Sequence, residues 1–123
     1  MGLNYTIAKD EGIVLIAPSG PITRSDLEAL TRDVDDYIRQ QGTIRGLIVH
    51  TRTFPRWRDP GSFLKDMQFV IDHQRKIRRV ASVTDSRLLM IVHGIAGRVF
   101  APEIRYFPYG DLEAARKWIR EGS

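Results

Sequence analysis

The sequence contains no cysteine among its 123 residues. This absence excludes disulfide bonds, thiolate nucleophiles and the cysteine-ligated zinc and iron–sulfur sites. No apolar run reaches the roughly 18 residues that a membrane-spanning helix needs. The first residues, MGLNYTIAKDEG, lack the basic start and long apolar core of a secretory signal. We therefore expect a soluble, cytoplasmic protein.

Common catalytic and nucleotide-binding motifs are also missing from the sequence. It has no G-x-S-x-G nucleophile elbow, no P-loop and no G-x-G-x-x-G segment. The three histidines, His50, His73 and His93, lack the spacing of metal ligands and fall on different predicted elements. We therefore predict a non-enzymatic protein without a cofactor or a metal. The enzyme alternative needs His50 as a general base beside Asp85.

The charge is weakly basic, with 19 Lys and Arg residues against 15 Asp and Glu residues and a formal net charge of +4. Arginine supplies most of the cations, because lysine occurs only at Lys9, Lys65, Lys76 and Lys117. Arginine suits bidentate contact with carboxylate or phosphate groups. The cations are dispersed among acids and no nucleic-acid-binding module accompanies them. A small anionic partner is therefore favoured over nucleic acid.

Turn residues and hydrophobic periodicity divide the chain into alternating strands and helices. Strands are predicted over residues 5–8, 13–17, 46–51, 77–84 and 104–107. Helices are predicted from a capping box at Ser25–Glu28 to Gly42, after Asp59–Pro60, from Asp85 or Ser86 to about Phe100, and after Asp111. A turn with Gly12 in the left-handed conformation joins the first two strands as a hairpin. The sequence thus predicts one α/β domain over residues 1–123, with a mostly parallel five-stranded sheet, an antiparallel N-terminal strand and about four helices.

Three of the predicted helices carry a periodic stripe that we expect to face the core. In the first helix the stripe consists of Leu27, Leu30, Val34 and Ile38. In the second helix it consists of Phe63, Leu64, Met67, Val70, Ile71 and Gln74. In the last helix it consists of Leu112, Ala115, Trp118 and Ile119.

The third predicted helix is apolar around most of its circumference, which a helix on one face of a small domain does not need. Its candidate outward residues are Leu88, Ile91, Val92, Ile95 and Val99. These side chains could form a homodimer interface, a lid over an apolar cavity or a contact with a membrane surface. The alternative is a helix buried deep in a well-filled core.

The segment Gly46–Asp66 is the predicted binding edge of the protein. An apolar strand there ends in polar residues and continues into a loop that is both aromatic and basic. Ligands of open α/β sheets bind at the carboxyl ends of the strands. We therefore predict a site for a lipid-like or anionic ligand at His50, Arg52, Phe54, Arg56, Trp57 and Asp85. Alternatively, Phe54 and Trp57 fold back to cover the end of the sheet.

A set of further residues lies in this loop, in the helix behind it, in the fourth and fifth strands and in the last helix: Phe54, Trp57, Asp66, Phe69, His73, Arg79–Asp85, Ile104–Phe107 and Ala114–Ile119. Together they resemble the SpoIIAA-like family, which shares the STAS fold and is related in architecture to Sec14/CRAL-TRIO lipid-binding domains. The resemblance covers residues 13–119. It implies a small non-enzymatic domain that holds a small ligand, associates with membranes or acts as an interaction module of the anti-sigma-factor-antagonist type. Relatives often carry acids where His50 and Thr53 stand, so this strand end is neutral or basic here.

The resemblance also singles out Ser62 as a candidate phosphorylation site. The broader STAS group includes proteins regulated by serine phosphorylation, and Ser62 stands in the first turn of the second predicted helix, where such a serine would lie. A phosphate there would meet free backbone N–H groups and the positive end of the helix. The surrounding Pro60–Phe63 does not reproduce the phosphorylation motif. The alternative is an ordinary first-turn serine.

Overall fold

Five strands form a single sheet whose spatial order follows the chain, β1-β2-β3-β4-β5. The structure is a computed structural model that describes residues 2–122. β1 (Leu3–Ala8) runs antiparallel to β2 (Ile13–Pro18), whereas β3 (Ile44–Thr51), β4 (Ile77–Thr84) and β5 (Glu103–Phe107) continue the sheet in parallel. The helices are α1 (Arg24–Gln41), α2 (Pro60–His73), a short 3-10 turn (Gln74–Lys76), α3 (Arg87–Ala96) and α4 (Leu112–Glu121). This arrangement confirms the predicted fold class.

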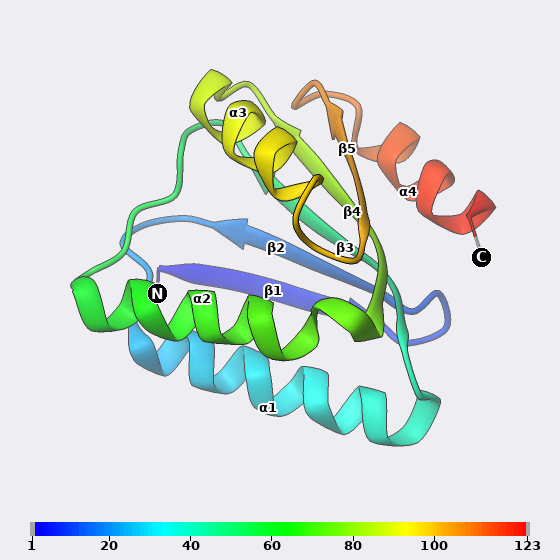
Figure 1. Cartoon of the computed structure of the whole chain (residues 1–123), viewed down its shortest axis with the longest axis horizontal. Coiled ribbons are helices and arrows are strands. Elements are labelled where there is room, and N and C mark those ends of the chain that lie inside the picture. The colour runs from blue at the N-terminus through cyan, green and yellow to red at the C-terminus, as the bar shows by residue number, and fades with distance from the viewer. Residues whose placement is uncertain (1, 123) are drawn as a thin grey trace.

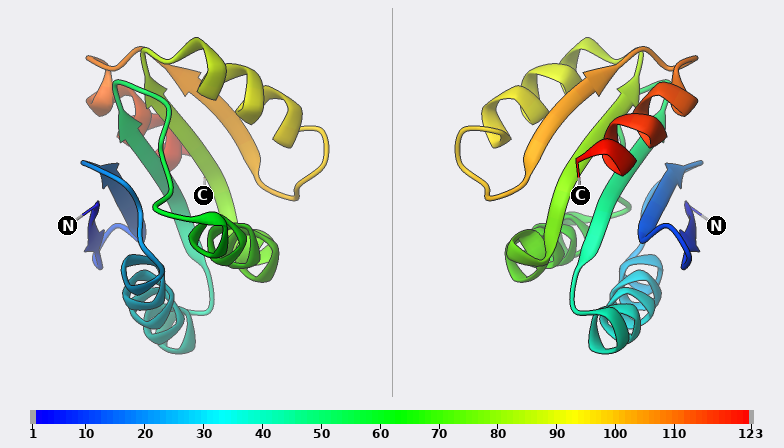
Figure 2. Two further views of the ribbon diagram at one scale, coloured as in Figure 1. Left: turned by 90° about the vertical axis from the view of Figure 1, so that its left-hand side faces the viewer. Right: turned by 90° about the vertical axis from the view of Figure 1, so that its right-hand side faces the viewer.

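Helices cover both faces of the sheet, α1 and α2 side by side on one face and α4 on the other (Figure 1). α3 packs over β4 and β5 on the face opposite α4 (Figure 2). A first core includes Val14 and Leu30 and lies beneath α1 and α2. A second core includes Ile48 and Ile119 and lies beneath α4. β2 contributes to both cores, as its continuous apolar sequence predicts.

The ends of α1 show how local chemistry sets its limits. Thr23 and Asp26 form a capping box, in which the Asp26 N–H donates to the Thr23 hydroxyl and the Thr23 N–H donates to the Asp26 carboxylate. The predicted box at Ser25 is therefore wrong by two residues. The reason lies just upstream, because Ile22 is held in extended conformation by backbone hydrogen bonds with the loop after β3. At the other end, Gly42 adopts a φ of 90° and ends the helix as predicted.

The predicted inward stripe of α2 is wrong for three of its six residues, whereas Val70 packs against the first core as predicted. The Asp59 cap and Pro60 start the helix where expected, but Phe63, Leu64 and Ile71 are 41%, 66% and 53% exposed. The buried residues of the helix are Ser62, Phe69 and His73. Hydrogen bonds satisfy the polar atoms of Ser62, Asp66 and His73 in the interior. The inward face of α2 is therefore rotated about the helix axis relative to the face predicted from hydrophobicity.

α3 begins at the Ser86 cap but ends at Ala96, earlier than the predicted Phe100. The chain continues as turns from Gly97, the residue type that favours a helix least after proline. In α4, Ala115, Trp118 and Ile119 are buried and Leu112 packs at the edge of the second core, as predicted. Among residues 2–122, none of the helices has the length and apolar character needed to cross a bilayer.

Candidate functional site

The carboxyl ends of β3, β4 and β5 bring three of the predicted ligand residues together around Tyr109. The His50 Nε2 lies 3.1 Å from the Tyr109 carbonyl oxygen, to which it donates, and the two rings stack with centroids 4.2 Å apart. The Arg52 guanidinium lies 4.2 Å from the centroid of the same ring. Asp85 accepts from the Tyr109 N–H at 3.4 Å and pairs with Arg52 at 3.6 Å. We call His50, Arg52, Asp85 and Tyr109 the outlet cluster.

Sequence reasoning missed Tyr109, the residue at the centre of the outlet cluster. The available signal was its position two residues after β5, because parallel neighbours end at the same edge of the sheet. The Arg52–Asp85 pair is largely exposed, so it adds little to stability. The cluster is a set of contacts at the predicted edge in which Arg52 and Asp85 are exposed and His50 and Tyr109 are half-buried.

The geometry gives no support to the enzyme alternative. His50 and Asp85 share no hydrogen bond in the described chain, and each binds the backbone of Tyr109 instead. Within residues 2–122, no group of three or more histidine, aspartate or glutamate side chains is placed to hold a metal ion.

The aromatic residues of the loop after β3 cover the end of the sheet. Phe54 and Phe63 both contact the Trp57 ring edge-on, at centroid distances of 6.0 and 5.0 Å. The Trp57 Nε1 donates to Asp66 at 2.8 Å, and burial raises the pKa of the Asp66 carboxyl. Phe54 and Trp57 are half-buried, which agrees with the covering alternative, whereas the neighbouring Arg56 is exposed.

The outer face of α3 is apolar and exposed. The five outward residues are between 41% and 71% exposed: Leu88, Ile91, Val92 and Ile95 in α3, and Val99 in the turn that follows it. We call them the α3 outer stripe. Leu89 is the buried residue of the helix, so the deep-core alternative for α3 is wrong. The stripe is flanked by Arg87 and Arg98, both exposed, and the segment from Arg87 to Val99 contains no acid.

Among residues 2–122, two polar atoms beneath α3 are buried without a hydrogen-bond partner. They are the Ser82 hydroxyl oxygen, on β4, and the His93 Nδ1, on α3. Burial lowers the pKa of His93. Unsatisfied buried polar atoms cost stability, so the contact between α3 and the sheet is less favourable than an apolar one of the same area.

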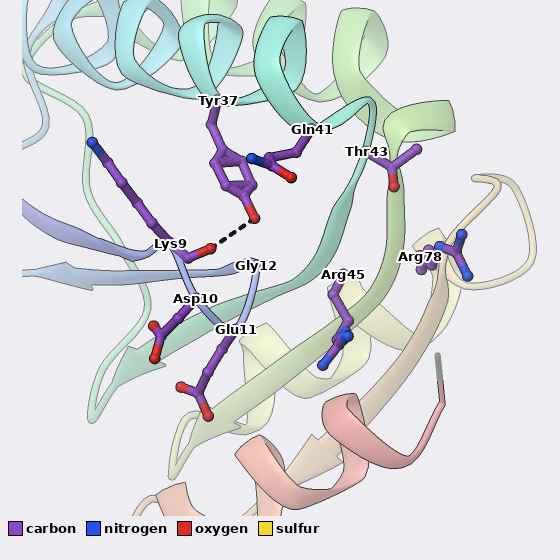
Figure 3. A pocket seen from close by; sticks show the side chains of 9 residues that line it. All are labelled: Lys9, Asp10, Glu11, Gly12, Tyr37, Gln41, Thr43, Arg45 and Arg78. Carbon is purple, nitrogen blue, oxygen red and sulfur yellow. Dashed lines mark hydrogen bonds between the residues drawn. The ribbon is translucent and has the colours of Figure 1, made fainter.

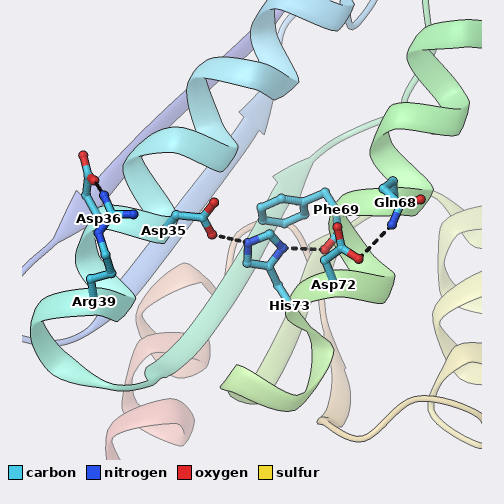
Figure 4. Close-up of polar contacts among 7 residues, drawn as sticks. All are labelled: Asp35, Asp36, Arg39, Gln68, Phe69, Asp72 and His73. Carbon is cyan, nitrogen blue, oxygen red and sulfur yellow. Dashed lines mark hydrogen bonds and ion pairs between the residues drawn. The ribbon is translucent and has the colours of Figure 1, made fainter.

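His73 links α2 to α1 (Figure 4). It is 6% exposed and stacks on Phe69. Its Nδ1 lies 2.7 Å from the Phe69 carbonyl oxygen and its Nε2 lies 2.7 Å from the Asp35 carboxylate. Both ring nitrogens therefore face oxygen acceptors. This histidine has a structural role in joining the two helices, and it is not part of the outlet cluster.

Ser62 is 1% exposed and its hydroxyl donates to the Asp59 carboxylate at 3.0 Å. The same carboxylate accepts from the Ser62 N–H, and these hydrogen bonds lower the pKa of Asp59. A phosphate on Ser62 would have to displace a negatively charged cap. The geometry favours the ordinary first-turn serine over the phosphorylation site.

The elements form a small α/β domain with helices on both faces of a five-stranded sheet. The chain belongs to the SpoIIAA-like family, whose model matches residues 13–120. It is similar in structure to an uncharacterized protein of the DUF3478 family from Shewanella loihica PV-4, described as having a SpoIIAA-like fold. The TM-score is 0.73 at 16% identity, over 95% of this chain and 91% of the other. No curated protein matches the sequence.

Proposed function

We propose that this protein is a non-catalytic module that binds the surface of an anionic membrane through the α3 outer stripe. The supporting observation is the stripe itself, in which four exposed aliphatic side chains recur along one side of α3, Val99 follows in the next turn, and the other side of the helix contacts the sheet. A helix with such a face lies in the plane of the interface, with its apolar side chains among the lipid headgroups and acyl chains.

The charges around the stripe favour an anionic surface over a neutral partner. Arg87 and Arg98 are exposed near the two ends of the helix, and no acid lies between them. Basic residues beside an anionic bilayer contribute about 1 kcal/mol each. Partial burial of five aliphatic side chains adds about 5 kcal/mol before the cost of immobilising the protein. We therefore expect weak, reversible and salt-sensitive binding.

A homodimer through α3 is the second candidate, because the same stripe could be covered by a second copy. An antiparallel pair of α3 helices would bring Arg87 of one copy close to Arg98 of the other. Like charges at that distance repel, whereas an anionic lipid surface attracts both. The charge pattern therefore favours the membrane.

Vesicle co-sedimentation at low salt tests the proposal. Wild-type protein is expected to sediment with phosphatidylcholine vesicles that contain phosphatidylserine, and much less with pure phosphatidylcholine. Ile91→Asp should reduce the bound fraction at least about tenfold, since it places a charge in the stripe. Ile71→Asp is the matched control, because Ile71 is a similarly exposed isoleucine on α2, 53% against 60% for Ile91.

Three results would contradict the proposal. The first is equal binding to both kinds of vesicle, and the second is equal loss in both aspartate variants. The third is a wild type that forms a dimer in light scattering but binds no vesicles, together with an Ile91→Asp variant that is a monomer. That third result would establish the homodimer instead.

A further inference from the structure

A cavity of about 470 Å³ opens at the end of the sheet opposite the outlet cluster (Figure 3). It lies between the β1–β2 hairpin, the last turn of α1 and the beginnings of β3 and β4. Its lining is polar and consists of Lys9, Asp10, Glu11, Gly12, Tyr37, Gln41, Thr43, Arg45 and Arg78. The volume is within the range of small-molecule sites.

Two arginines from neighbouring strands line this cavity. Arg45 and Arg78 occupy the same level of neighbouring strands, because the residues flanking them are paired, Ile44 with Ile77 and Gly46 with Arg79. Adjacent strands are about 4.8 Å apart, and like charges placed directly opposite each other are destabilising. Throughout residues 2–122, no carboxylate pairs with either guanidinium. An anion held between them would relieve this repulsion.

The acids of the cavity do not supply that anion. Glu11 pairs with Arg120 at 2.7 Å and with Arg116 at 3.7 Å, so its charge is already matched by α4. Asp10 is exposed at the tip of the hairpin. Lys9 adds a third cation to the lining. The cavity therefore carries an excess of positive charge.

The rim of the cavity is fixed by backbone contacts. The Gly12 carbonyl oxygen accepts from the N–H groups of Arg45, at 2.9 Å, and Gly46, at 3.2 Å. The Tyr37 hydroxyl donates to the Lys9 carbonyl oxygen at 3.1 Å. Gly12 itself has a φ of 70°, which fits the tight turn. The hairpin is thus tied to both β3 and α1, and a site that is ordered before binding loses less entropy on binding.

We propose that this cavity binds a small molecule that carries a phosphate group, with Arg45 and Arg78 as the residues that contact the phosphate. Two planar guanidinium groups can each donate two hydrogen bonds to phosphate oxygens. Gln41 and Thr43 also line the cavity and offer further hydrogen-bonding groups to the rest of the molecule. This site is separate from the α3 outer stripe and does not depend on membrane binding.

NMR titration of the full chain at low salt, with adenosine 5′-monophosphate and with inorganic phosphate as probes, tests this proposal. We expect saturable amide shifts confined to residues 9–12, 41–45 and 77–79, with a Kd of about 1 mM or below for the nucleotide. The double variant Arg45→Gln/Arg78→Gln should weaken binding at least about tenfold. Arg87→Gln/Arg98→Gln removes the same charge from α3 and should leave binding within about twofold.

The outcomes separate this site from general attraction to positive charge. Equal weakening in both double variants, or shifts spread over all the arginines, would overturn the proposal. So would an equal response to succinate, which carries two carboxylates and no phosphate, or the absence of saturation at about 10 mM of either probe. Thermal unfolding provides the folding check. Arg45→Gln/Arg78→Gln should melt no lower than wild type, because it removes two adjacent like charges.

Discussion

Replacing Gly46 by alanine should force α4 away from the sheet. A Cβ atom at Gly46 would lie 2.4, 2.6 and 2.8 Å from the Cγ2, Cδ1 and Cγ1 atoms of Ile119. Ile119 is completely buried in the second core, so it cannot move into solvent without loss of packing. Overpacking of this kind costs about 1–3 kcal/mol. For a chain of this length we expect a decrease in melting temperature of about 4 °C per kcal/mol.

A double-mutant cycle assigns this cost to the contact between Gly46 and Ile119. Ile119→Ala alone should lose about 2–5 kcal/mol, because it opens a cavity beneath α4. In Gly46→Ala/Ile119→Ala the new methyl group occupies part of that cavity. The two substitutions together should therefore cost at least about 1 kcal/mol less than the sum of the single effects.

The assay is urea unfolding followed by circular dichroism, and Gly94→Ala serves as the control. Gly94 lies in α3, and apart from its two chain neighbours and the nearby backbone of its own helix no atom comes within 4 Å of the place that an alanine Cβ would take. Alanine there should stabilise the protein by about 0.5–1 kcal/mol. Additive losses in the cycle, or a Gly46→Ala protein as stable as wild type, would refute the packing of α4 against β3.

Three further predictions concern single buried polar groups. Burial raises the pKa of Asp66 above its ordinary value of 3.8, so the stability of the folded protein falls as the pH rises through the folded-state pKa. Asp66→Asn should therefore be more stable than wild type at pH 7. In urea unfolding, this advantage should vanish below pH 3.8. Burial lowers the pKa of His93 below 6.5, so the free energy of unfolding decreases as the pH falls below 6.5 and becomes constant below the folded-state pKa. His93→Leu should remove this pH dependence and increase the free energy of unfolding by about 1 kcal/mol, as measured by thermal unfolding at several pH values. His73→Ala should lower the free energy of unfolding by about 3 kcal/mol, because it removes the link between α1 and α2, and Asp35→Asn should lower it by less. Hydrogen exchange of His73→Ala should show that α2 loses protection first.

Backbone signals in the sequence predicted the fold well. Both ends of β4 agree with the prediction, and Gly12 and Gly42 have the positive φ values expected of a tight turn and a helix end. These features depend on a few neighbouring residues, which the sequence displays directly. Thr23 shows the limit of such signals. The capping box forms at Thr23 and not at Ser25 because a distant loop pairs with Ile22 and holds it in the extended conformation.

Features that depend on contacts between distant segments were harder to predict. The inward face of α2 was assigned by hydrophobicity alone, although Asp66 and His73 face inward because Trp57 and Asp35 satisfy them. Tyr109 was missed because its role depends on the ends of β3, β4 and β5 lying at the same edge of the sheet. The sequence did not predict that Arg45 and Arg78 occupy neighbouring positions, because only the register of β3 against β4 places them at the same level.

The position of α4 has a consequence for the order in which the chain can fold during synthesis. The apolar face formed by Ile48, Ala81 and Val83 is covered by side chains from Ala115 to Ile119. These residues follow all five strands in the chain, and domains fold as units while the chain emerges from the N-terminus. The sheet therefore keeps one apolar face open until α4 has been made. α4 closes that face and, through the Arg120–Glu11 ion pair, ties the last helix to the first hairpin.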